Sequence, residues 1–174
     1  MSEKKLKSGV ITFIGLANEY CVAVENALQE EKDDFVGKML DLLPRLYITI
    51  RGTEAVEPDM LSGMDAFSRH SYMDEDYYDT VRGNLERLMG EDDIFLETFE
   101  EDMKYSDTPI AVSISESLAD IFQSLYNFVS VVRDTDGDSA DEAFADCKEN
   151  FEEYWGQTLC NVLRPLNSLH YRQN

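Results

Sequence analysis

Apolar residues recur at steps of three and four along almost the whole chain, and this helical period is the feature that most limits its fold. The clearest stripe runs from Ile114 to Val132, directly after a Ser113-x-x-Glu116 capping box. No segment shows a convincing alternation of the kind that a half-buried strand requires. The period therefore predicts an all-α protein.

Five segments are predicted to form the main helices. They cover about 8–30, 33–50, 74–89, 113–132 and 139–166, and the last begins with a second capping box, Ser139-x-x-Glu142. Pro44 predicts a kink or a break near residues 41–43, and Pro165 predicts a late kink or the end of the fifth helix. A short helix containing Phe95, Phe99 and Met103 is expected before the fourth.

These helices predict an antiparallel helical bundle of about five main helices plus short helices, forming a single domain over residues 1–174. Nine phenylalanines and nine tyrosines predict an aromatic-rich core. Residues at about 51–73 have no sustained period and are expected to form an irregular connection. A connection of that length is unusual in a compact domain and can serve a function.

The charge excludes some classes of partner. The chain has 36 acidic residues against 15 lysines and arginines, a formal net charge of −21. Nucleic acids and anionic membranes are bound by clustered basic residues, so we expect neither to bind directly. No stretch is long and apolar enough to span a membrane. The three cysteines (Cys21, Cys147 and Cys160) include no C-x-x-C pair, which predicts reduced, buried thiols and a soluble cytoplasmic protein.

The acidic residues are concentrated in two windows, 91–107 and 134–153. Together these windows hold 17 acids and 2 bases, which accounts for −15 of the net charge. One interpretation is a surface that attracts a basic partner. The other is a solvated outer face that keeps the domain soluble.

Motifs for catalysis or metal binding are scarce. There are two histidines, His70 and His170, and neither Glu-x-x-His nor H-E-x-x-H occurs. The loop at 134–142 departs from a calcium-binding EF-hand because its glycine is fourth, not sixth. Glu97-x-x-Glu100 and Glu149-x-x-Glu152 have the spacing of magnesium-binding pairs, although such pairs arise by chance in an acidic chain. We expect no metal and no cofactor, and the sequence favours a binding protein over an enzyme.

Several polar residues lie among apolar neighbours in the predicted helices. If they face inward they must be paired, as a buried network that fixes helix register or as a ligand site. The main examples are Asn18, Glu19, Glu25, Asp41, Arg45, Asp76, Arg82 and Asp120.

Four groups of residues together resemble an uncharacterised bacterial all-helical domain family of unknown function. They are residues 17–21 (ANEYC), 43–47 (LPRLY), 72–78 (YMDEDYY) with Arg82, and Trp155-Gly156 with Leu163-Arg164. The resemblance spans most of the chain. It implies an all-helical, single-domain cytoplasmic protein, and it implies no activity or functional residues.

The sequence therefore predicts an acidic adaptor or accessory subunit for a basic protein partner. The candidate partner-binding residues are Glu97, Glu100, Glu101, Asp141, Glu149, Glu152 and Glu153. One alternative is a magnesium-dependent phosphohydrolase that uses clustered carboxylates. A second is a nucleic-acid mimic whose carboxylates imitate phosphates. The sequence leaves homodimerisation through an apolar helix face open.

Overall fold

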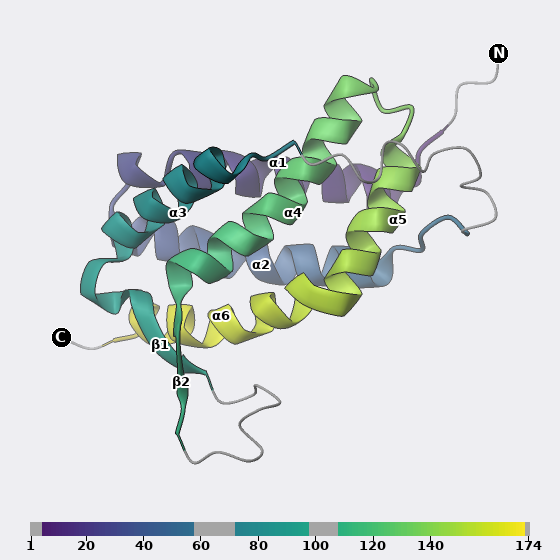
Figure 1. Cartoon of the computed structure of the whole chain (residues 1–174). Coiled ribbons are helices and arrows are strands. Elements are labelled where there is room, and N and C mark those ends of the chain that lie inside the picture. Colours follow the sequence, from purple (N-terminus) through teal and green to yellow (C-terminus); the bar gives the residue numbers. More distant parts are fainter. Residues whose placement is uncertain (1–4, 58–71, 98–107, 173–174) are drawn as a thin grey trace.

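The protein is a bundle of α-helices with one small β-hairpin at its side (Figure 1). The structure is a computed structural model, and it describes residues 5–57, 72–97 and 108–172. The α-helices are α1 (Ser8–Glu25), α2 (Lys32–Gly52), α3 (Glu75–Met89), α4 (Ile114–Asp134), α5 (Ala140–Asn150) and α6 (Gly156–His170). A 3-10 turn (Ala27–Gln29) follows α1, and a second (Gly90–Asp93) follows α3. The expectation of an all-α fold is confirmed.

Helix α4 lies at the centre of the bundle and contacts α1, α3, α5 and α6. Its stripe of apolar residues, the strongest in the sequence, is buried accordingly. Rings from three helices meet in the core: the Phe13 centroid lies 5.1 Å from that of Phe128 and 5.3 Å from that of Phe144. Tyr20 is fully buried and its hydroxyl donates to the carbonyl oxygen of Leu118 at 2.8 Å. The core is aromatic-rich, as expected.

The prolines do not interrupt their helices. Helix α2 continues through Pro44 to Gly52, and α6 continues through Pro165 to His170. The predicted break near residues 41–43 and the predicted end at Pro165 are therefore wrong. A proline removes its own amide donor and its ring crowds the carbonyl four residues back, and here packing of the apolar face along each helix outweighs both costs.

The predicted fifth helix is divided by a π turn (Phe151–Trp155) between α5 and α6. The amide of Gly156 donates to the carbonyl oxygen of Phe151, five residues back. A Cβ at position 156 would lie 2.6 Å from that oxygen, so the turn requires glycine there. The indole of Trp155 donates to the carbonyl of Cys147 at 3.2 Å and fixes the turn on its buried side.

The expectation that the chain has no strand is wrong. Strands β1 (Ile94–Glu97) and β2 (Ile110–Ser113) pair antiparallel, with Ile94 opposite Ser113 and Glu97 opposite Ile110. Phe95 therefore lies in a strand, where a short helix was predicted; Phe99 and Met103 lie outside the described residues. Each strand is a run of three apolar residues followed by one polar residue, IFLE and IAVS, so neither shows an alternating pattern.

Buried hydrogen bonds join the hairpin to α4. Asp93 is 5% exposed, and its two carboxylate oxygens accept from the amide and the hydroxyl of Ser115, each at 2.7 Å. The hydroxyl of Ser113 accepts from the amide of Glu116 at 3.1 Å, which confirms the predicted N-cap. Two side chains thus satisfy amides at the start of α4.

Other predicted helix ends have mixed outcomes. Helix α3 keeps close to its predicted bounds of 74–89: Asp74 caps it by accepting from the amide of Tyr77 at 2.7 Å, and Gly90, with a positive φ of 57°, follows its last residue. Ser139 precedes α5 but its side chain makes no capping bond. The expected irregular connection at 51–73 is shortened by α2, which ends at Gly52, and residues 58–71 lie outside the described part of the chain.

Candidate functional site

Four acidic residues of α5 and of the π turn that follows it lie along one side of the helix. Glu142, Asp146, Glu149 and Glu153 follow one another at steps of four, three and four, which places them on one helical face. Asp146 is half-buried, whereas Glu149, Glu152 and Glu153 are exposed. We call Asp146, Glu149, Glu152 and Glu153 the α5 acidic face.

The base nearest to this face in the sequence is engaged elsewhere. The ammonium group of Lys148 donates to the carbonyl oxygen of Thr53 at 2.7 Å, at the C-terminal end of α2. A lysine at that position satisfies an unpaired helix carbonyl and interacts favourably with the helix dipole. Lys148 therefore stabilises the contact between α5 and α2 and does not neutralise the acidic face.

The ion pairs between described residues all lie away from the acidic face. They are Lys32–Asp92, Lys38–Glu30, Arg82–Glu86 and Arg172–Asp92. Burial, and then the charge of Glu149, raise the pKa of the Asp146 carboxyl above its usual range. The carboxylates of this face thus lie close together, and none of them takes part in an ion pair between described residues.

The π turn directs the C-terminal part of the acidic face. Phe151 and Trp155 point into the core, and their rings lie 4.7 Å apart. Glu152, Glu153 and Tyr154 between them are exposed. Because the turn adds a residue to the helical ladder, three consecutive polar or aromatic side chains reach solvent between two buried rings.

The predicted partner-binding residues do not all lie on this surface. Glu149, Glu152 and Glu153 are exposed together, but Asp141 is 8% exposed and Glu97 is 3% exposed. Glu100 and Glu101 lie outside the described residues. Sequence periodicity could have identified Asp141, since it lies three residues before Phe144 and so shares the inward face of α5. No local feature of the sequence marks Glu97 as buried.

Of the four described acids in the first acidic window, three are paired or buried within the protein. Asp92 accepts from Lys32 at 2.7 Å and from Arg172 at 2.8 Å, and these partners hold the pKa of its carboxyl below its usual range. Asp93 caps α4 and Glu97 is buried. The pairing of Asp93 with Ser115 was missed by sequence reasoning because 22 residues separate them.

The expected network of buried polar residues is not found. Seven of the eight candidates are exposed and Arg82 is half-buried. Asp120 accepts from the hydroxyl of Tyr78 at 2.5 Å, and Arg82 pairs with Glu86 one turn along the same helix. The spacing alone was misleading, because the apolar residues beside these positions point to the other side of each helix. Similarly, Cys21 and Cys147 are buried as predicted, but Cys160 is exposed.

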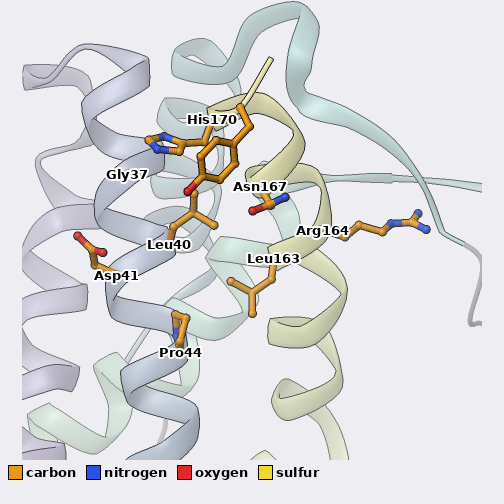
Figure 2. Close-up of a pocket in the computed structure, with 9 residues that line it drawn as sticks. Gly37, Leu40, Asp41, Pro44, Leu163, Arg164, Asn167 and His170 are labelled. Atoms are coloured by element: carbon orange, nitrogen blue, oxygen red, sulfur yellow. The ribbon is translucent and has the colours of Figure 1, made fainter. Parts of the chain in front are cut away.

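A groove of about 650 Å³ lies between α2 and α6 (Figure 2). Leu40 and Pro44 from α2 and Leu163 from α6 point into the space between the two helices. Asn167 and His170 lie at its upper end, and Asp41 lies on its outer edge; Tyr171 also lines the groove. Arg164 points away from the groove and donates to the carbonyl oxygen of Leu96 in β1 at 2.7 Å.

Metal binding gains no geometric basis from these residues. Within 5–57, 72–97 and 108–172, no group of three or more His, Cys, Asp and Glu side chains is placed to hold a metal ion. His70 and half of the Glu97-x-x-Glu100 pair lie outside those ranges. None of the described helices is both long and apolar enough to cross a bilayer.

Comparisons with known proteins agree with the fold. The crystal structure of protein BF1032 from Bacteroides fragilis, a Northeast Structural Genomics Consortium target, superposes with a TM-score of 0.81 at 31% sequence identity. The match covers 97% of this chain and 96% of that one. No curated protein matches the chain. Residues 4–172 match the model of a domain of unknown function, DUF5063. The chain therefore belongs to the DUF5063 family, which confirms the resemblance to an uncharacterised helical family.

Proposed function

We propose that this protein is an adaptor or accessory subunit that binds a basic protein partner through the α5 acidic face. The observation that carries the proposal is the position of Lys148. The side chain donates to Thr53 across the bundle, and the carboxylates of Glu149, Glu152 and Glu153 are exposed and form none of the ion pairs found between described residues. Keeping like charges together has an electrostatic cost, which a cationic partner would relieve.

The acidic face is suited to fast but salt-sensitive association. Its carboxylates lie on a continuous helical rod and reinforce one another over distances shorter than the Debye length of about 8 Å at physiological salt. Complementary charge of this kind mainly raises the rate of encounter and selects among partners. The exposed Tyr154, 68% accessible, adds an aromatic contact at the same place.

The experiment compares three tagged baits in the host lysate, with proteins eluted by stepped salt and identified by mass spectrometry. The test variant is E149K/E152K/E153K. A matched control, E19K/E75K/E91K, reverses three exposed acids on α1, on α3 and in the turn after α3. Each variant changes three charges by two units and so raises the net charge from −21 to −15.

A basic partner that elutes at moderate salt from the wild type and the control, and is lost from the test variant, would support the proposal. We expect the affinity for that partner to fall by at least about tenfold. Recovery of the same proteins at the same salt from all three baits would refute it, because only the location of the reversed charges differs.

A further inference from the structure

The face formed by α2 and α6 differs from the rest of this acidic protein. Residues 154–174 contain no aspartate or glutamate, although the chain carries a net charge of −21. Two copies of such a chain repel each other, and they approach most easily through a surface with few acids. The groove between α2 and α6 lies on that side of the molecule (Figures 1 and 2).

Apolar side chains continue the groove at both ends. Along α2, Leu40, Pro44 and Ile48 share one stripe, and Ile48 is 71% exposed. Along α6, the corresponding stripe contains the exposed Cys160, half-buried Leu163, exposed Asn167 and the 70% exposed Tyr171. We call these residues, with Asp41, the α2–α6 face. Ile48 and Tyr171 are thus exposed at the two ends of this face, with the half-buried Leu40, Pro44 and Leu163 between them, and exposed apolar surface of this kind is where another protein can bind.

The two helices run in opposite directions along this face. Gly37 lies beside His170, and Pro44 lies beside Leu163 (Figure 2). One turn further, Ile48 of α2 and Cys160 of α6 come at the same end of the groove. This register fixes which residues would meet if a second copy were placed on the face.

We propose that the α2–α6 face is a homodimer interface, covered by the same face of a second copy. A two-fold axis parallel to the helices places α2 of each copy over α6 of the other and keeps equivalent residues at the same height. Asp41 of one copy then faces Asn167 and Tyr171 of the second, so that a carboxylate meets hydrogen-bond donors. Pro44 and Ile48 of one copy meet Leu163 and Cys160 of the second, so that apolar side chains pack together.

The charge of the face favours a second copy over an acidic or a basic partner. The one acid of the face, Asp41, lies on its α2 edge, and the hydrogen-bond donors Asn167 and Tyr171 lie on its α6 edge. The two-fold axis brings the α2 edge of each copy against the α6 edge of the other. An isologous interface requires this self-complementarity. The contact area is small, roughly 20 Å along α6 and two helix widths across, so a weak dimer with a Kd in the micromolar range is expected.

This dimer is independent of the adaptor proposal, and the two respond to salt in opposite ways. Salt screens the repulsion between two chains of charge −21 and should strengthen the dimer. The same salt should weaken binding of a basic partner to the α5 acidic face. Failure of one proposal therefore leaves the other intact.

The test measures the mass of the protein by sedimentation over a concentration series, with wild type, I48D and the control I11D. Ile11 is 55% exposed on α1, away from the face, so both variants place one charge at an exposed isoleucine. At concentrations of roughly 100 μM we expect the wild type and I11D to approach twice the 19.9 kDa chain mass. We expect I48D to remain a monomer and the association constant to fall at least about tenfold.

Cys160 provides a second readout in the unmodified protein, because Cys21 and Cys147 are buried. Its alkylation by a maleimide should slow as the protein concentration rises. If I48D does not fold, Y171E replaces it in the same series. A wild type that stays at the monomer mass at every concentration and salt would overturn the proposal, as would equal masses for I48D and I11D.

Discussion

Asp92 and Asp93 are neighbours that test whether burial or the number of contacts decides the strength of a polar interaction. Each carboxylate makes two contacts at 2.7 to 2.8 Å: Asp92 with Lys32 and Arg172, and Asp93 with the amide and hydroxyl of Ser115. Asp93 is 5% exposed and Ser115 is 1% exposed, whereas the side chains of Lys32 and Arg172 are 37% and 53% exposed. Each carboxylate accepts two hydrogen bonds, so any difference in what the two aspartates contribute to stability must come from their burial.

D93A should destabilise the protein by about 3 kcal/mol. The substitution removes two hydrogen bonds to a carboxylate and leaves the buried amide and hydroxyl of Ser115 without that partner, each a loss of about 1–3 kcal/mol before relaxation. D92A should cost about 1 kcal/mol or less, because exposed ion pairs contribute about 0–1 kcal/mol each. S115A removes one of the two bonds to Asp93 and should cost about 1 kcal/mol.

Urea denaturation followed by far-UV circular dichroism at neutral pH gives the free energy of unfolding for each variant. A double-mutant cycle between D93A and S115A isolates their coupling, which should be favourable to folding. Equal losses of stability in D92A and D93A would refute the reasoning, because they would show that burial does not decide between these contacts.

Three further substitutions test individual features. G156A should destabilise the protein by about 1–3 kcal/mol in urea denaturation, because its Cβ would lie 2.6 Å from the carbonyl oxygen of Phe151; unchanged stability would contradict the assigned π turn. D146N should raise the Tm at neutral pH. Burial raises the pKa of Asp146 in the folded protein above its unfolded value of about 3.9. The carboxyl group therefore costs no stability at a pH below the unfolded pKa, and the cost of its charge develops as the pH rises through the folded pKa. The Tm difference, followed by thermal scans from acidic to neutral pH, should therefore vanish at low pH, and a constant difference would exclude this cause. Y20F should cost about 1 kcal/mol by removing the buried hydrogen bond to Leu118, and a stability equal to wild type would show that this bond contributes nothing.

The outcome for the acidic residues shows where sequence reasoning stops. The charge windows were visible in the sequence, but it could not distinguish exposed Glu149 from buried Glu97. Glu97 is buried in a strand whose partner begins 13 residues later, at Ile110. Lys148 counted as a compensating charge in its window, although its side chain reaches Thr53, 95 residues away. Whether a charge is buried or neutralised depends on distant parts of the chain, which local spacing does not specify.

The sequence by itself determined where most of the helices lie and the cap at Ser113, because helical hydrogen bonds, capping and apolar period all act within a few residues. The tertiary structure alone decided the β-hairpin, the buried contact of Asp93 with Ser115, the continuity of α2 through Pro44 and the groove between α2 and α6. Each of these depends on free energy gained between segments far apart in the chain. That gain can outweigh a local preference such as the missing amide of a proline, and it appears only once the helices have packed.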